Sequence, residues 1–101
     1  MSYRVEYGSS FLDAVKTRVA YLRATGASED AIERWFANLF DLIDGLYTMP
    51  KRGPVAEAQT TTYGFEVRRL VFGDHLIYYR VDEERHAVGV LFLMYGAQQS
   101  Q

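Results

Sequence analysis

The chain has 101 residues, enough for one domain with a modest core and too few for two, so residues 1–101 are treated as a single domain. Apolar residues form 49% of the sequence and aromatic residues 15%, a composition that excludes a disordered chain. A net charge of −2 argues against a nucleic-acid-binding surface spread over the whole protein, and the lack of cysteine excludes disulfides, thiolate nucleophiles and cysteine-bound metals.

The first half of the sequence predicts one strand followed by two helices. Residues 3–7 alternate apolar and polar side chains, which is the pattern of a short, half-buried strand. A helix capped by Ser10 is expected to follow and to end at Gly26, with apolar residues along one stripe. Ser28 caps a second helix, whose broad apolar face contains Ile32, Trp35, Phe36, Leu39, Phe40, Ile43 and Leu46.

Proline and glycine separate this half from three predicted strands. The segment Pro50–Pro54 holds both prolines of the chain and breaks the helical pattern. Residues 55–62 are polar, with three consecutive threonines, and are predicted to form a loop. The apolar period then changes to two, so strands are expected at residues 65–70, 75–81 and 88–95, with turns at 72–74 and 82–86.

The expected order of elements is therefore β-α-α-β-β-β. Two helices joined by a short turn form an antiparallel hairpin, and neither a hairpin nor a sheet can bury its apolar side alone. We predict an α+β fold in which the helical hairpin packs on one face of an antiparallel sheet. Trp35 and Phe36 are expected in the helix–sheet core, and no helix is expected between Val67 and Val81.

The second half of the sequence resembles a known family. Residues 68–81 read as an arginine-containing strand, a glycine turn and an apolar-Tyr-Arg-Val strand, which resembles the core of ParE-type toxins in the RelE/ParE superfamily. Pro50 followed by Gly53-Pro54 is similar to the Pro…Gly-Arg-Pro loop of that family. Tyr95-Gly96-Ala97 stands where ParE-like proteins usually have His-Gly-Ala-Arg. The resemblance extends over roughly residues 3–97 and includes the order of the elements.

This resemblance implies the toxin of a type II toxin–antitoxin system of the plasmid stabilisation type, neutralised by a cognate antitoxin protein. RelE-like members of the superfamily cleave mRNA on the ribosome, whereas ParE-like members poison DNA gyrase. Leu76 stands where the RelE pattern places an arginine, and no tyrosine follows Gly96. We therefore expect a ParE-like toxin that inhibits DNA gyrase by binding, without catalytic residues. The alternatives are a ribosome-dependent mRNA endonuclease and an inactive toxin that retains antitoxin binding.

The residues expected to bind partners are Arg68, Arg69, Arg80 and Tyr95, which would also form the catalytic cluster if the chain were a nuclease. Arg68 and Arg69 should point to opposite faces of their strand, and either could instead be an ordinary solvated or ion-paired arginine. Two surfaces are expected to accept the antitoxin. The apolar face of the helical hairpin can hold an amphipathic helix, and a sheet edge can pair with an added strand.

No cofactor or metal is expected, because His75 and His86 lie far apart in sequence with no converging ligands. Tyr78 and Tyr79 are expected to pack in the sheet rather than to take part in chemistry. The first residues contain no apolar run that resembles a signal peptide, and no stretch approaches about 18 continuous apolar residues. These features predict a cytoplasmic protein without membrane contact.

Overall fold

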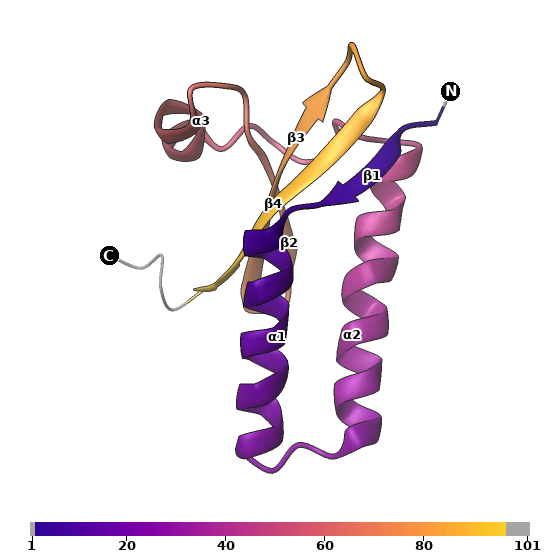
Figure 1. Cartoon of the computed structure of the whole chain (residues 1–101), viewed down its shortest axis with the longest axis vertical. Coiled ribbons are helices and arrows are strands. Elements are labelled where there is room, and N and C mark those ends of the chain that lie inside the picture. The colour runs from indigo at the N-terminus through magenta and orange to yellow at the C-terminus, as the bar shows by residue number, and fades with distance from the viewer. Residues whose placement is uncertain (1, 97–101) are drawn as a thin grey trace.

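The structure is a computed structural model in which residues 2–96 are described. The predicted α+β class and the order β-α-α-β-β-β are confirmed, with one short helix added before the second strand (Figure 1). The elements are β1 (Arg4–Tyr7), α1 (Ser9–Ala24), α2 (Glu29–Asp44), the 3-10 turn η1 (Gly45–Tyr47), α3 (Glu57–Tyr63), β2 (Arg68–Phe72), β3 (His75–Asp82) and β4 (Ala87–Tyr95). No helix lies between Val67 and Val81, as predicted.

The strands form one sheet in the order β1-β4-β3-β2. The pairs β2–β3 and β3–β4 are antiparallel, but β1 runs parallel to β4, with Val5 opposite Val88. The expectation of a wholly antiparallel sheet was wrong in this one pairing. The helical hairpin carries the chain from β1 at one edge of the sheet to β2 at the other edge. The antiparallel strands β2, β3 and β4 then bring β4 back beside β1, running in the same direction.

The helices α1 and α2 lie side by side and antiparallel, and the turn that joins them is at the end of the hairpin away from the sheet (Figure 1). The Ser28 hydroxyl accepts a hydrogen bond from the Ala31 amide at 3.1 Å, so the predicted cap of α2 is confirmed. The predicted Ser10 cap was wrong. The helix α1 begins at Ser9, and Gly8 occupies the capping position without a side-chain hydrogen bond.

The main core lies between this hairpin and one face of the sheet. Its fully buried members from the helices include Phe11, Leu39 and Ile43, and those from the sheet are Ile77, Tyr79, Val88 and Val90. Trp35 joins this core as predicted, with its ring centroid 5.9 Å from that of Phe72 and 5.7 Å from that of His75. The placement of Phe36 in the core was wrong. This ring is 46% exposed because it lies on the side of α2 that turns away from the sheet.

The segment predicted as a polar loop at residues 55–62 contains α3 instead. The Thr61 and Thr62 hydroxyls donate to the carbonyls of Glu57 and Ala58 within the same helix. Gly64 ends the helix with a left-handed φ of 81°. Threonines have low intrinsic helix propensity, so the three consecutive threonines predicted a loop. The structure has a short helix there instead.

The loop at residues 50–54 is anchored to the sheet at Gly53. Its amide donates to the buried Tyr79 hydroxyl at 3.0 Å, and its carbonyl accepts from the Arg68 guanidinium at 2.8 Å. A Cβ atom at Gly53 would lie only 2.2 Å from the Arg69 carbonyl oxygen. Glycine is therefore required here by the close approach of two backbone segments.

Candidate partner-binding face

The face of the sheet turned away from the hairpin carries two cross-strand rows. Arg69, Tyr78 and Phe92 lie opposite one another on β2, β3 and β4, and Val71, Leu76 and Met94 form the next row. Residues directly opposite in neighbouring strands share a face. With Arg80 and with Phe65, which packs over them, these residues make up what we call the open face: Phe65, Arg69, Val71, Leu76, Tyr78, Arg80, Phe92 and Met94.

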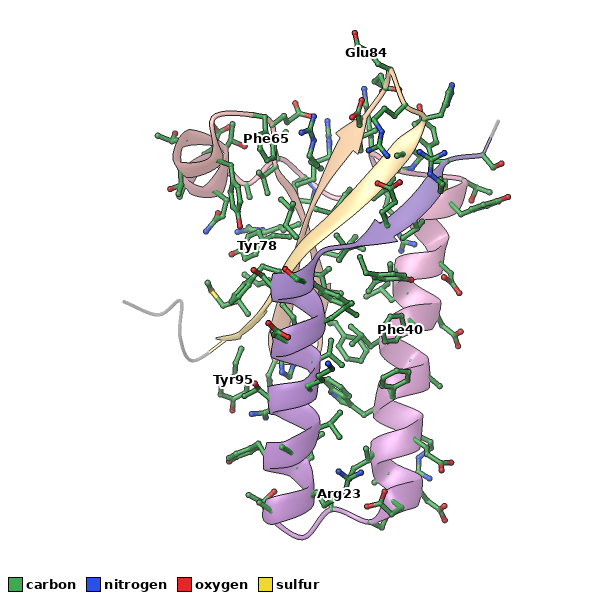
Figure 2. The ribbon with its side chains drawn as sticks, in the orientation of Figure 1. Arg23, Phe40, Phe65, Tyr78, Glu84 and Tyr95 are labelled. Atoms are coloured by element: carbon green, nitrogen blue, oxygen red, sulfur yellow. The ribbon has the colours of Figure 1, made fainter. Side chains whose placement is uncertain are left out.

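Only part of the open face is covered by the chain itself. Ala56 and Phe65 pack over Tyr78 and Leu76, which are almost fully buried. Figure 2 shows Phe65 and Tyr78 on the side of the sheet where α3 lies. Beyond this cover, Val71 is 67% exposed, and the rest of the surface continues over half-buried side chains of β4. Apolar area left uncovered in this way makes the open face a candidate interaction site.

Two of the predicted site residues meet on this face. Arg69 lies directly opposite Tyr78, and Arg80 follows Tyr78 by two positions on the same strand. The two arginines are therefore diagonal neighbours, about 7–8 Å apart at their backbones. The Arg80 guanidinium lies 4.3 Å from the centroid of the Phe65 ring, and its Nε is buried without a hydrogen-bond partner among residues 2–96. The Arg80 side chain as a whole is only half-buried, so the outer end of its guanidinium is the part that could meet a carboxylate from another molecule.

Arg68 lies on the other side of β2, as the strand alternation predicts. Its Nε is 3.1 Å from a Glu66 carboxylate oxygen, and its terminal nitrogen donates to the Gly53 carbonyl at 2.8 Å. The side chain is only 17% exposed. Arg68 is thus occupied in holding the loop at residues 50–54, which is the ion-paired alternative left open for it.

Tyr95 also lies apart from the two open-face arginines. It is opposite His75 in the register, on the helix side of the sheet, with ring centroids 5.3 Å apart. The Arg18 guanidinium from α1 stacks on the Tyr95 ring at 4.2 Å and on the Tyr21 ring at 4.5 Å. Tyr95 meets Arg69 only along the rim of an open depression of about 550 Å³ beside the β2–β3 turn. The four predicted residues therefore do not form one cluster.

Sequence reasoning missed the part that Arg18 and His75 play in this arrangement. The spacing of Arg18 and Tyr21 on one helix was the available signal for their stacking, but the third member comes from a distant strand. His75 is 6% exposed, and its Nε2 is buried without a partner in the described part of the chain. Burial, helped by the nearby Arg18 charge, lowers the pKa of His75, so its imidazole is neutral at pH 7.

The phenols of the sheet are poor candidates for base chemistry. Burial raises the pKa of Tyr78, opposed by the positive charge of Arg69, and burial likewise raises the pKa of Tyr79. Both phenols are therefore protonated at neutral pH. Within residues 2–96, no group of three histidine or carboxylate side chains is placed to hold a metal ion. The open face thus offers two arginines, the neutral phenol of Tyr78 and apolar area, which suit binding rather than proton transfer.

Similarity to known proteins shows the family and the fold of the chain. The sequence matches, over residues 5–100, the family described as "ParE toxin of type II toxin-antitoxin system, parDE". The chain belongs to the ParE toxin family. Its fold matches the crystal structure of the archaeal RelE–RelB complex from Pyrococcus horikoshii OT3, with a TM-score of 0.56 and 16% sequence identity, over 97% of this chain and 99% of that one. No curated protein sequence matches the chain.

Membership of the ParE toxin family covers nearly the whole described structure. Of the family-like tripeptide at residues 95–97, Ala97 lies outside the described residues. Leu76, which stands where the RelE pattern has an arginine, is buried in the row between Val71 and Met94. None of the helices formed by residues 2–96 has the length and apolarity needed to cross a membrane.

Proposed function

We propose that this ParE-family chain is the toxin of a type II toxin–antitoxin pair and inhibits DNA gyrase by binding through its open face, without catalytic residues of its own. One observation carries the proposal. The open face joins partly uncovered apolar area to the diagonal pair Arg69 and Arg80, and its buried phenol is protonated. These groups can hold an acidic and apolar partner surface, and they supply no general base.

The same geometry weighs against the alternative of mRNA cleavage. Cleavage without a metal requires a base for the 2′-hydroxyl, cations around the phosphate and an acid for the leaving oxygen. Here Arg68 is bonded to Gly53 and Glu66, and Tyr95 packs between the His75 ring and the Arg18 guanidinium on the helix side. On the open face a nuclease would have only Arg69 and Arg80, which lie beside an apolar row. Neither arginine can serve as the general base or general acid that cleavage needs.

The antitoxin is proposed to pair an extended segment with this face, while the apolar face of the helical hairpin remains the surface predicted to accept an amphipathic helix. The free edge of β2 is blocked in its first half, because Val55 bridges to Arg68 and the Pro54 carbonyl accepts from the Arg69 amide at 3.1 Å. The chain's own loop thus acts as a short added strand. The remaining edge at residues 70–72 and the adjacent open face can receive an extended segment, whose carboxylates would pair with the two arginines.

Two assays run side by side test the proposed target. The purified chain is titrated into a DNA gyrase supercoiling reaction, and it is also added to a translation reaction in which mRNA ends are mapped by primer extension. The proposal predicts loss of supercoiling with intact mRNA. Ribosome-dependent mRNA cleavage with unaffected supercoiling would establish the endonuclease alternative. No effect in either assay, together with tight antitoxin binding, would indicate an inactive toxin.

Antitoxin binding is tested separately with the small protein encoded next to this chain. The affinity is measured for the wild type, for Arg80→Ala and for Arg34→Ala, in which an exposed arginine on α2 away from the open face is removed as a control. Loss of a charge-assisted contact should weaken binding by about tenfold for Arg80→Ala and leave Arg34→Ala unchanged. Tight binding that ignores Arg80 would reject the arginine contact while leaving the toxin–antitoxin pair intact.

A further inference from the structure

Part of the open face is covered by a segment that is attached to the chain mainly at its two ends. We call residues 57–66, which comprise α3, Gly64, Phe65 and Glu66, the flap. No residue of α3 is buried, and Figure 1 shows this helix projecting from the sheet, apart from both helices of the hairpin. In the described part of the chain, the hydrogen bonds of the flap all end on residues 56–68. The flap is therefore held to the rest of the chain chiefly at its base.

The base of the flap is firm. The Ala56 amide donates to the Val67 carbonyl at 2.7 Å, and both residues are buried. The Val67 amide in turn donates to the Thr60 hydroxyl at 2.8 Å. Ala56 and Val67 are thus paired like the two ends of a hairpin. The segment between them can swing about this base without disturbing β2 or the loop anchored at Gly53.

One side chain of the flap closes over the open face. Phe65 packs against Tyr78 and lies over the Arg80 guanidinium, 4.3 Å from the ring centroid. Beneath it the Arg80 Nε is buried without a hydrogen-bond partner among residues 2–96. The cation–π contact favours closure, whereas a buried donor that lacks an acceptor favours exposure to water or to a partner. These two contributions oppose each other, so neither position of Phe65 is strongly preferred on their account.

We propose that the flap is a gate on the open face, closed by Phe65 in the free chain and opened when a partner binds. The gate rests on the proposed function, because it regulates the face assigned to partners there. With Phe65 in place, Tyr78 is covered and a partner carboxylate can meet only the outer end of the Arg80 guanidinium. With Phe65 displaced, Nε and a terminal nitrogen can bind the carboxylate together. Only the open form then binds fully, and the closed fraction weakens the apparent affinity by the same factor.

Two variants remove the gate without touching the arginine beneath it. Phe65→Ala removes the closing ring, and a flapless variant replaces residues 57–65 with Asn-Gly. Because the ends of the flap are already hydrogen-bonded to each other, a tight turn can join them. Tyr47→Ala is the control, since it removes an exposed aromatic ring outside the flap. Melting curves check that each variant is folded.

Closure is measured in the free chain by the rate at which the Arg80 Nε–H exchanges with water, followed by NMR. The wild type and Tyr47→Ala should exchange at least about tenfold more slowly than Phe65→Ala and the flapless variant, because the Phe65 ring shields the proton. The ratio of the two rates gives the ratio of closed to open gate. Equal exchange rates in the wild type and the flapless variant would overturn the closed state, whatever the open face binds.

Gating is measured by titration calorimetry with the small protein encoded next to this chain. Phe65→Ala and the flapless variant should bind it more tightly than the wild type by about the ratio found from exchange, and Tyr47→Ala should bind like the wild type. A shielded Arg80 proton with unchanged or weaker binding in both variants would overturn the gate and leave the open face as the binding site. A small protein that binds neither the wild type nor the flapless variant would contradict the proposed function, and the gate with it.

Discussion

The two faces of the sheet are built from the same three strands, β2, β3 and β4, yet they differ in how much of the chain covers them. On the helix side, Ile77 and Tyr79 are fully buried under α1 and α2. On the open side, the intervening Tyr78 and Arg80 meet only the short segment around α3. Successive side chains of one strand thus alternate between the core under the hairpin and the open face.

This difference means that substitutions on the two faces should separate stability from function. A side chain under the hairpin loses its packing when it is truncated, and the cavity that remains adds to the cost. A half-buried side chain on the open face has little packing to lose within the monomer. Its removal should instead lower the affinity for a partner.

The largest expected effect comes from a matched pair of phenylalanines. Phe11 is fully buried, with its ring centroid 5.7 Å from that of Tyr7 and 6.0 Å from that of Phe40. Phe11→Ala should lower the free energy of unfolding by about 3–5 kcal/mol. Phe92→Ala, on the half-covered face, should cost about 1 kcal/mol. Urea unfolding measures both losses of unfolding free energy, provided that the two variants share the same dependence on urea concentration. Equal losses would contradict the distinction between the two faces.

Gly53→Ala should be nearly as damaging, although it adds only one methyl group. The new Cβ would meet the Arg69 carbonyl at 2.2 Å and the Tyr79 hydroxyl at 2.9 Å. The loop must then move away from β2 and give up its bond to Tyr79, at about 2–3 kcal/mol of unfolding free energy. Gly26→Ala is a useful comparison, since its Cβ would meet nothing within 4 Å and the strain there comes only from a φ of 95°. A melting temperature for Gly53→Ala equal to that of the wild type would reject the close approach.

The neighbouring arginines of β2 should give opposite results. Arg68→Ala removes the bonds to Glu66 and Gly53 and should destabilise the chain by about 1.5–2 kcal/mol, leaving the open face intact. Arg69→Ala should change stability by less than about 0.5 kcal/mol and weaken antitoxin binding. Thermal melting and titration calorimetry on the two variants supply both quantities. Reversal of the pattern would exchange their assigned roles.

The smallest expected effect is a pH dependence that comes from His75. Burial first, and the Arg18 charge second, lower the pKa of His75, with Asp74 opposing them. The unfolded chain takes up a proton near pH 6.5 and the folded chain only at lower pH, so stability should fall as the pH drops below about 6.5. In His75→Phe this contribution should be absent. Parallel stability curves for wild type and variant between pH 7 and pH 5 would reject the buried neutral imidazole.

Most of the fold was accessible from the sequence because its signals are local. The strand at residues 3–7, the hairpin and the three C-terminal strands each have a clear apolar period, and Ser28 marks the second helix correctly. The parallel pairing of β1 was not accessible, since it depends on where β4 arrives in space. The helix α3 was missed because its threonines favour other conformations and its ends are fixed by contacts such as the bond between the Val67 amide and Thr60 at 2.8 Å.

The site was less predictable than the fold. Strand alternation separates Arg68 from Arg69, but it cannot show that Arg68 is bound to the loop at Gly53, since that contact joins distant segments. Arg69 and Arg80 become diagonal neighbours only through the β2–β3 register, which sets Arg69 opposite Tyr78. Tyr95 was grouped with the arginines on family grounds. The β3–β4 register places Tyr95 opposite His75 on the helix side, and its stacking with Arg18 joins two distant segments, which the sequence does not indicate.

The central claim, that the chain acts by binding through its open face, is tested most directly by the amount of protein needed to halve gyrase supercoiling. The account predicts that wild type and Arg34→Ala inhibit at amounts comparable to that of gyrase. Arg69→Ala/Arg80→Ala, with an unchanged melting temperature, should require about a hundredfold more, because it lacks two charge-assisted contacts. Inhibition by this double variant at the wild-type amount would contradict the account.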